Sequence, residues 1–153
     1  MSQKEWGNIT WALFHTLAEK INENEFHNIK NNVISFIKHT CNNLPCPMCS
    51  NHAIKTLEKA SIDLIKTKAD LIEFLRQFHN IVNVRTEKPI VEKEFVITYY
   101  KNLDLVIIIN HFIKVYSHKY GNFDISAFNR SNQRSLYLRN GIPRLKEFLK
   151  YCY

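Results

Sequence analysis

The sequence predicts an all-α fold, a four-helix bundle followed by additional helices. Apolar residues recur at helical spacing in four successive stretches, and only short turns separate those stretches. The chain has three glycines, and no strand-like segment precedes its cysteine motif, as a βαβ pattern would require. Four amphipathic helices joined by short turns are typical of an up-and-down bundle. We expect these helices over residues 6–22, 26–41, 46–60 and 69–84.

The first predicted helix carries two apolar stripes. One stripe runs from Ile9 to Ile21, and the adjoining one contains Trp11 and His15. The two rings are four residues apart, so they lie on neighbouring turns and could together enclose a flat ligand. The alternative is that Trp11 belongs to the core and that protein groups satisfy the hydrogen bonds of His15.

A proline-rich turn separates the second and third predicted helices. Pro45 and Pro47 end the preceding helix and suit the first turn of the next one. Cys46 should therefore lie near a helix N-terminus, where free N–H groups and the helix dipole lower a thiol pKa below its usual ~8.5. Helical spacing also places His52 on the same side as Cys49, so that its ring can reach the sulfur atoms.

The fourth predicted helix combines an apolar stripe with polar side chains at its C-terminal end. His79, Asn80 and Asn83 lie beside core positions such as Phe78. Buried polar groups are unfavourable unless a partner satisfies them, and a bound polar cofactor would do so. Lys88 follows the helix and could supply a cation for a phosphate group. Because the chain has no G-x-G-x-x-G loop, side chains and helices would have to hold any nucleotide.

The last third of the chain is also expected to be helical. Helices are predicted over residues 91–101 and 103–117, although the β-branched run within the second one also suits a strand. A turn into a short helix is expected over residues 122–132. A terminal helix is expected over residues 143–150, with Gly141 at its start.

These elements suggest two parts of one compact chain. Residues 1–100 contain the predicted bundle and the cysteine motif. Residues 101–153 form a helical extension that we expect to pack on this core, because no linker of low complexity separates the two parts.

Cys46 and Cys49 form a Cys-x-x-Cys motif. Two thiols at this spacing can close into a disulfide, open by exchange with a thiolate and so transfer two electrons at one point. Another possibility is a non-catalytic, zinc-binding interaction module, because Cys41, Cys46, Cys49 and His52 form a plausible tetrahedral ligand set. A purely structural disulfide is the third possibility. A thioredoxin-like site would need a preceding strand.

Composition and charge limit the classes of function. The 153 residues suffice for one domain with a substantial core. The net charge of +7 comes from scattered basic residues, which favour a solvated surface over nucleic-acid binding. The first six residues lack the apolar segment of a secretory signal, and the longest apolar run falls short of the ~20 residues of a membrane span. We therefore expect a cytoplasmic protein with no membrane span, in which a disulfide is transient and catalytic.

Three segments occur in the order typical of one family. They are WGNITWALFHTLA at residues 6–18, LPCPMC at residues 44–49 with His52, and FHNIVN at residues 78–83 with Lys88 and Pro89. In these segments the chain resembles the Erv/ALR family of FAD-linked sulfhydryl oxidases, over about residues 6–100. The Pro-Cys-Pro-x-Cys form is most similar to the members encoded by large cytoplasmic DNA viruses.

The resemblance implies an FAD-dependent thiol oxidase. Such an enzyme forms disulfide bonds in protein substrates and passes the electrons through the Cys-x-x-Cys disulfide to FAD and then to dioxygen, giving hydrogen peroxide. The resemblance also implies a helical bundle that holds FAD at its mouth, and a homodimer packed through the first two helices. For a viral protein, the expected location is the host cytoplasm or the virion.

Site residues follow from their positions in the family motifs. Cys49 matches the cysteine beside the flavin, and Cys46 matches the cysteine that reacts with the thiols of the substrate. Trp11 and His15 match positions at the adenine end of FAD. The resemblance implies further cofactor contacts from Gly7, His52, His79, Asn80, Val82, Asn83 and Lys88.

Two features depart from the family pattern. Cellular members carry a further structural cysteine pair, but the chain has no cysteine between residues 51 and 151. Tyr99 and Tyr100 stand about where the family has a tryptophan that contacts the cofactor. The tail residue Cys152 could pair with Cys41, form a mixed disulfide with a substrate or accessory protein, or stay reduced. We expect it to be dispensable for the oxidation of small thiols.

Overall fold

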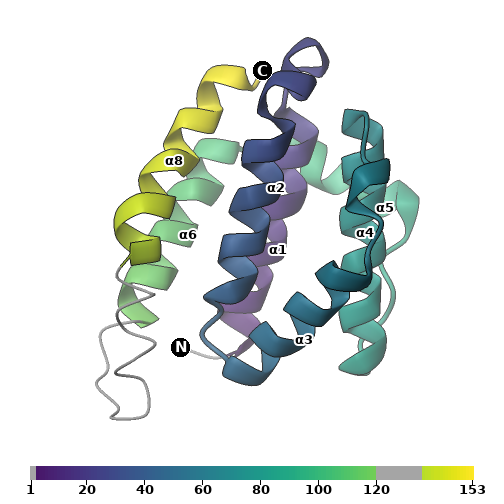
Figure 1. Cartoon of the computed structure of the whole chain (residues 1–153), viewed down its shortest axis with the longest axis vertical. Helices are drawn as coiled ribbons and strands as arrows, with labels where there is room; N and C mark the ends of the chain where they lie inside the picture. Colours follow the sequence, from purple (N-terminus) through teal and green to yellow (C-terminus); the bar gives the residue numbers. More distant parts are fainter. Residues whose placement is uncertain (1–2, 120–135) are drawn as a thin grey trace.

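The computed structural model describes residues 3–119 and 136–153, and the described elements are helices and helical turns (Figure 1). The all-α prediction is therefore confirmed. Within the described residues, the extended pairing is an isolated bridge between Ile21 and Cys152. The longer helices are α1 (Gln3–Lys20), α2 (Phe26–Asn42), α3 (Pro47–Lys59), α4 (Lys68–Arg85), α5 (Lys93–Tyr99), α6 (Leu105–Lys119) and α8 (Ile142–Glu147). Shorter turns are η1 (Glu23–Glu25), η2 (Ile62–Leu64), η3 (Tyr100–Asn102), the π-helical η5 (Tyr137–Gly141) and η6 (Phe148–Tyr151).

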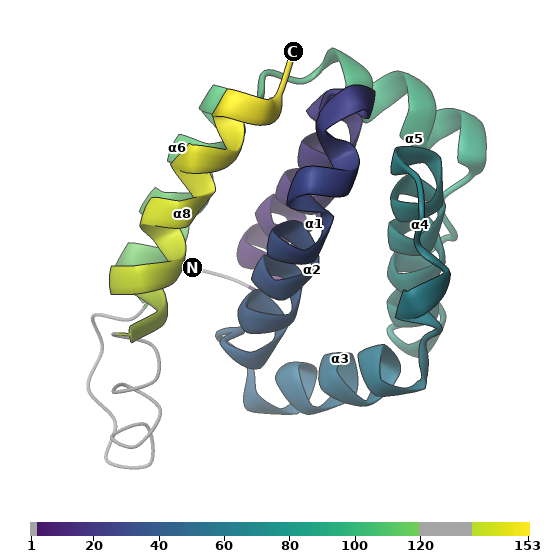
Figure 2. The same cartoon turned by 45° about the horizontal axis from the view of Figure 1, so that its top comes forward.

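The helices form three adjacent layers (Figure 2). α1 and α2 make the central layer, α4 and α5 lie on one side of it, and α6 and α8 lie on the other side. α3 runs across one end of the molecule, from the end of α2 towards the layer of α4, instead of lying along the other helices. Its buried residues are Ser50, Ala53 and Leu57. This narrow stripe suits a helix that covers an end of the bundle.

One hydrophobic cluster runs through all three layers. α1 supplies its centre, and Leu13 and Leu17 are completely buried. α6 adds Phe112, and the C-terminal helical run adds Leu145. Burying each such side chain contributes about 1.5–3 kcal/mol to stability. The residues of the predicted extension therefore share one core with the predicted bundle.

Local sequence signals explain where α4 begins. The hydroxyl of Thr67 accepts a hydrogen bond from the backbone N–H of Asp70 at 3.1 Å, and the Asp70 carboxylate accepts one from the backbone N–H of Thr67 at 2.9 Å. This reciprocal capping box satisfies backbone donors that have no partner within the helix. Hydrogen bonds from the backbone N–H groups of Lys66 and Thr67 lower the pKa of the Asp70 carboxyl group.

The predicted C-terminal helices are partly confirmed. α5 lies within the helix expected over residues 91–101, η3 extends one residue beyond it, and α6 confirms a helix over the β-branched run. The prediction for residues 122–132 lies outside the described residues. The terminal helix expected over residues 143–150 corresponds to α8 and η6, and helical backbone precedes it at Leu136 and through the π-helical turn η5. Gly141 is the N-cap residue of α8, as expected, and its φ of −81° and ψ of −45° continue the helical backbone of η5.

The last residues of the chain dock on the end of α1. The backbone N–H of Asn22 donates to the carbonyl of Tyr151 at 2.8 Å, and the N–H of Tyr153 donates to the carbonyl of Lys20 at 2.9 Å. Cys152 lies between these two contacts and is buried. As for membrane insertion, none of the described helices is both long enough and apolar enough to cross a bilayer.

Candidate functional site

Cys46 and Cys49 are joined by a disulfide at the start of α3. Cys46 is the N-cap residue and Pro47 occupies the first turn, as the proline pattern predicts. The Cys46 Sγ accepts a hydrogen bond from the backbone N–H of Cys49 at 3.2 Å. Both cysteines are partly buried. One helix start thus holds a disulfide next to backbone donors that favour a thiolate.

Ser50 supports the turn that carries the disulfide. Its buried hydroxyl accepts a hydrogen bond from the backbone N–H of Leu44 at 3.1 Å, and its own N–H donates to the carbonyl of Cys46 at 3.0 Å. These bonds connect both sides of the Pro45–Pro47 turn. Sequence reasoning missed Ser50, although a serine one turn after a helix N-cap is a frequent partner for nearby backbone groups.

A cavity of about 120 Å³ lies between α1, α3 and α4. We call it the Cys49 cavity because Cys49 lines it, whereas Cys46 does not. Flat rings of Trp11 and His79 form part of its wall, and Arg85 and Lys88 supply cations. Its remaining lining residues are Trp6, Gly7, Asn8, Thr10, Phe14, Cys41, Leu44, Ala53, Phe78, Val82, Asn83 and Thr86.

Aromatic rings stack in a row beside the Cys49 cavity. The Trp11 and His79 rings are nearly parallel, with centroids 4.1 Å apart. Nε2 of His15 lies 3.0 Å from Nδ1 of His79, so one of these histidines donates a hydrogen bond to the other. Tyr100 stacks on the other side of His15, with ring centroids 4.4 Å apart. Tyr100 therefore contacts the row of rings through His15, although it does not line the cavity.

Both histidines of this row are neutral at pH 7. Burial, with a smaller contribution from the neighbouring His79, lowers the pKa of His15 to about 3. Burial also lowers the pKa of His79 to about 4, with an additional contribution from Lys88. Within the described residues, Nδ1 of His15 is buried without a hydrogen-bond partner. Such an atom is unfavourable in a core and suits a site where a water molecule or ligand supplies the partner.

The structure brings most of the predicted cofactor residues together. Gly7, Trp11, Cys49, His79, Val82, Asn83 and Lys88 all line the Cys49 cavity. His15 lies directly behind His79 and contacts it. His52 is exposed on α3 and does not line the cavity.

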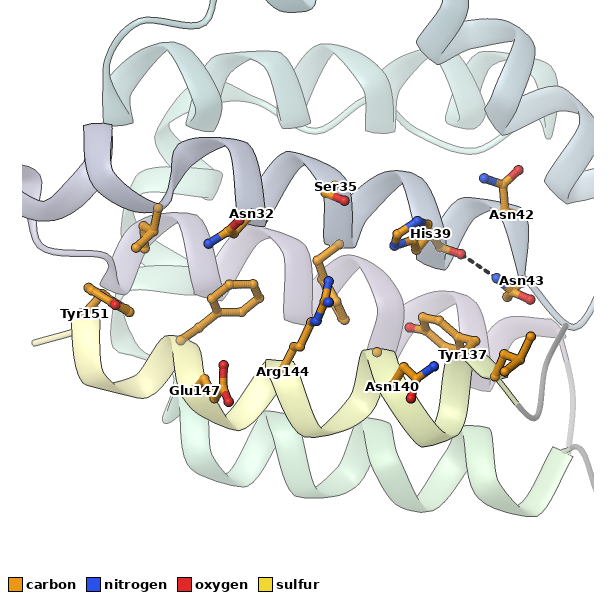
Figure 3. A pocket seen from close by; sticks show the side chains of 15 residues that line it. Asn32, Ser35, His39, Asn42, Asn43, Tyr137, Asn140, Arg144, Glu147 and Tyr151 are labelled. Atoms are coloured by element: carbon orange, nitrogen blue, oxygen red, sulfur yellow. Dashed lines mark hydrogen bonds between the residues drawn. The ribbon is translucent and has the colours of Figure 1, made fainter.

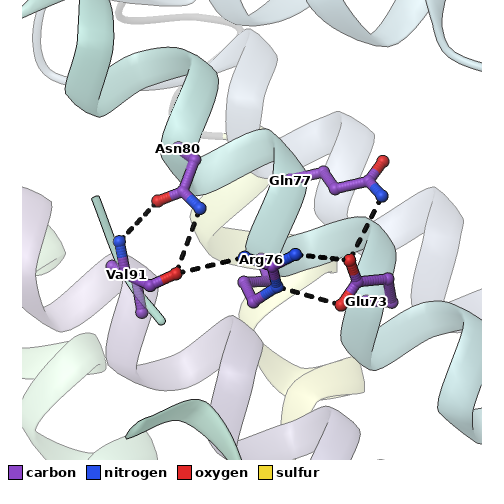
Figure 4. A network of polar contacts seen from close by, with 5 residues as sticks. All are labelled: Glu73, Arg76, Gln77, Asn80 and Val91. Atoms are coloured by element: carbon purple, nitrogen blue, oxygen red, sulfur yellow. Dashed lines mark hydrogen bonds and ion pairs between the residues drawn. The ribbon is translucent and has the colours of Figure 1, made fainter. Parts of the chain in front are cut away.

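Asn80 holds a turn instead of facing the cavity (Figure 4). Its side-chain amide donates to the carbonyl of Val91 at 3.1 Å, and its side-chain oxygen accepts from the Val91 N–H at 2.6 Å. Arg76 donates to the same carbonyl at 3.3 Å and pairs with Glu73 at 2.7 Å. Asn80 thus holds in place the segment that follows Lys88, which is a lining residue of the cavity.

Arg85 and Cys41 are among the lining residues that had not been singled out for this site. Arg85 lies three positions before Lys88 and adds a second cation to the cavity wall. Cys41 lines the wall as a buried free thiol, and burial raises its pKa to about 12. Cys41 is therefore a protonated, unreactive thiol in this arrangement.

The zinc-binding alternative has no support in this geometry. Cys46 and Cys49 are bonded to each other, while Cys41 is buried and His52 is exposed. Over residues 3–119 and 136–153, no three histidine, cysteine or acidic side chains converge in a way that could hold a metal ion.

Comparisons with known proteins all indicate the same family. A family model described as the Erv1 / Alr family matches residues 8–101. The inferred FAD-linked sulfhydryl oxidase 096R of Invertebrate iridescent virus 3 is 32% identical over 87 residues, which make up 56% of this chain and 59% of that protein. The inferred FAD-linked sulfhydryl oxidase 347L of Invertebrate iridescent virus 6 is 34% identical over 91 residues, 56% of this chain and 82% of that protein.

A further relative comes from a different group of viruses. The FAD-linked sulfhydryl oxidase of African swine fever virus is 31% identical over 86 residues, 56% of this chain and 71% of that protein. No solved structure matches the chain. The family model therefore covers the part of the chain that runs from α1 through α5, and the chain matches 096R over less than two thirds of the length of that protein.

Proposed function

Because the chain belongs to the Erv1/Alr family, we propose that it is an FAD-dependent thiol oxidase that forms disulfide bonds in protein substrates. One observation carries this proposal. The Cys46–Cys49 disulfide has one residue in the wall of an aromatic, positively charged cavity and the other outside that cavity. A thiol pair in this position can exchange with substrates on one side and with a cofactor on the other.

The residues of the Cys49 cavity fit FAD. Flat rings of Trp11 and His79 suit a base or an isoalloxazine ring, and Arg85 and Lys88 suit the pyrophosphate. The cavity is smaller than the ~300–1,000 Å³ of a typical ligand pocket. Since Trp11 stacks directly on His79, we expect these two rings to separate when FAD enters.

Thiol exchange at Cys46 would begin the reaction. A substrate thiolate attacks the Cys46 Sγ, the Cys46–Cys49 bond breaks, and Cys49 leaves as a thiolate at the N-terminus of α3. A second substrate thiolate then attacks the substrate sulfur of the mixed disulfide, which forms the substrate disulfide and releases Cys46 as a thiolate. The Cys49 N–H, which already bonds to the Cys46 Sγ, can stabilise that charge. FAD, when bound, takes the two electrons from the reduced cysteine pair and passes them to dioxygen, giving hydrogen peroxide.

A homodimer packed through α1 and α2 also remains part of the proposal. α1 is enclosed by its neighbours, and the exposed side chains of α2 are polar. Among the described residues, large apolar side chains are exposed on α4 and α5, including Ile81, Val84, Phe95 and Tyr99. These side chains offer a second candidate surface for a homodimer. A location in the host cytoplasm or the virion stays a prediction.

The test is to purify the protein, desalt it and record its absorbance spectrum and its oxygen uptake with dithiothreitol. We expect a yellow protein with about one FAD per chain that consumes oxygen and produces hydrogen peroxide. The Cys46→Ser/Cys49→Ser double variant is the control and should be inactive. A colourless protein with one equivalent of zinc and no oxygen uptake would reject the oxidase in favour of the zinc-binding module.

A further inference from the structure

A second cavity of about 860 Å³ lies between α2 and the C-terminal helical run (Figure 3). We call it the α2–α8 groove. Ile29, Phe36 and Phe148 form its buried floor. Polar side chains from both walls line it, with Asn32, Ser35, His39 and Asn42 from α2 and Asn140, Arg144 and Glu147 from the opposite wall.

We propose that the α2–α8 groove binds an extended segment of the reduced polypeptide substrate and guides its thiol to Cys46. This inference rests on the proposed function and adds the substrate class to it. The ligand is a flexible or unfolded polypeptide, recognised mainly through its backbone.

The chemistry of the walls suits a polypeptide backbone. Each residue of an extended chain presents an N–H donor and a C=O acceptor, and both need partners when they leave water. Asn side chains can supply a donor and an acceptor at once, and Ser and His can do the same. Asn32, Ser35, Asn42 and Asn140 are therefore matched to a ligand with many amide groups. The apolar floor can accept alternate side chains of the same segment.

The dimensions of the groove also suit this ligand. Its wall on α2 extends from Ile29 to Asn43, which corresponds to about 21 Å at 1.5 Å per helical residue. An extended chain of about six residues spans that length at roughly 3.3 Å per residue. A segment of this size is available in an unfolded protein, whereas a small thiol such as dithiothreitol fills only a fraction of it.

The groove ends beside the redox site. Asn43 lines its last part and stands three residues before Cys46, so the two Cα atoms are at most about 11 Å apart. The hydroxyls of Thr40 and Tyr137 form a buried hydrogen bond of 2.7 Å that joins the two walls near this end. A groove whose walls are already fixed loses little conformational entropy of its own when a ligand binds. Cys46 lies outside the Cys49 cavity, as expected for the cysteine that receives the substrate.

The experiment compares bulky substitutions inside and outside the groove. Asn32→Trp and Asn140→Trp place an indole ring in the groove from opposite walls. Asn31→Trp is the matched control, because Asn31 is an exposed neighbour on α2 that does not line the groove. The activity probes are reduced, unfolded ribonuclease A and dithiothreitol. The binding probe is fluorescently labelled, carboxymethylated ribonuclease A, which has no free thiol and is followed by fluorescence anisotropy.

We expect both groove variants to weaken binding of the carboxymethylated protein by about tenfold. The ratio of kcat/KM for reduced ribonuclease A to kcat/KM for dithiothreitol should fall by a similar factor, mainly through KM. Asn31→Trp should match the parent in both measurements. The inference is wrong if the groove variants are folded and bind the labelled protein as tightly as Asn31→Trp does. A parent that binds this probe in the groove but never oxidises dithiothreitol would reject the proposed function alone.

Discussion

The hydroxyl group of Tyr116 on α6 lies 2.6 Å from the hydroxyl group of Thr10 on α1, and both residues are buried. Thr10 donates its own hydrogen to the carbonyl of Trp6, also at 2.6 Å, so Tyr116 is the donor in the first bond. Thr10 and Trp6 line the Cys49 cavity. Tyr116 lies beyond residues 8–101, the part matched by the family model. The C-terminal part of the chain therefore supports a wall of the proposed cofactor site.

Replacing Tyr116 by Phe should loosen this wall. The substitution removes one buried hydrogen bond, worth about 1 kcal/mol, and we expect Tm to fall by about 2–4 °C. The variant should also retain less FAD after desalting, because Thr10 and Trp6 lose their support. Differential scanning fluorimetry and the flavin absorbance measure these two effects. Ser117→Ala is the control, since it removes an exposed hydroxyl group from the same helix. Equal melting temperature and flavin content in both variants would show that the bond does not support the site.

Single substitutions in the disulfide should separate the roles of the two cysteines. Cys49 lines the cavity and Cys46 does not, so only Cys49 is placed to approach a bound flavin. Cys46→Ser should abolish dithiothreitol oxidation and leave a free Cys49 that produces a long-wavelength charge-transfer band with FAD. Cys49→Ser should abolish both the activity and the band. An active Cys46→Ser variant would show that the assignment is reversed or wrong.

His79 should be essential for retaining FAD. Its ring stacks on Trp11 and lines the cavity, so His79→Ala removes a flat wall of the site. A ligand that binds only the folded state stabilises it by ~2.7 kcal/mol at a hundredfold excess over Kd. We therefore expect the variant to lose flavin and to gain less stability than the parent from added FAD. His27→Ala, at an exposed position of α2, is the control. The same FAD-induced rise in Tm in both variants would argue against a cofactor contact at His79.

The two buried histidines should make the stability of the FAD-free protein depend on pH. Their pKa values in the folded protein, about 3 for His15 and about 4 for His79, lie below the value of about 6.5 for an unperturbed histidine. Between these values the unfolded chain binds more protons than the folded one, so stability rises with pH. Urea unfolding should therefore show a falling free energy of unfolding from pH 6.5 towards pH 4. His79→Gln removes one titrating ring and should flatten this slope, whereas His27→Gln should not. A parent slope equal to that of His79→Gln would contradict this linkage.

Local patterns predicted the parts of the site that depend on neighbours in sequence. Pro45 and Pro47 place Cys46 at a helix start because both act on their own turn. Trp11 and His15 lie on neighbouring turns of one helix, and both rings contact His79. The sequence did not predict the structural role of Asn80. Its partner is the backbone of Val91, and the position of Val91 depends on the turn after Lys88. The Thr40–Tyr137 bond joins residues 97 positions apart, and no periodicity in either helix indicates it.

Cys152 provides the last prediction, because the structure places it far from the other free thiol. Cys41 lies in the last turns of α2, whereas Cys152 pairs with Ile21 just before that helix begins. From Phe26 to Cys41, α2 extends for about 22 Å, and a disulfide requires Cα atoms within about 7 Å. Both thiols are free and buried in the structure.

The surroundings of Cys152 also disfavour a role in exchange. Its Sγ donates a hydrogen bond to the carbonyl of Phe148 at 3.2 Å, and burial raises its pKa to about 11. A buried, protonated thiol reacts slowly because the thiolate is the nucleophile. We therefore expect Cys152→Ser to oxidise both dithiothreitol and reduced ribonuclease A at the parent rate. Mass mapping of the resting protein should find Cys41 and Cys152 reduced. Loss of dithiothreitol oxidation, or a stoichiometric Cys41–Cys152 link, would overturn this expectation, and a loss confined to reduced ribonuclease A would assign Cys152 to a mixed disulfide with protein substrates.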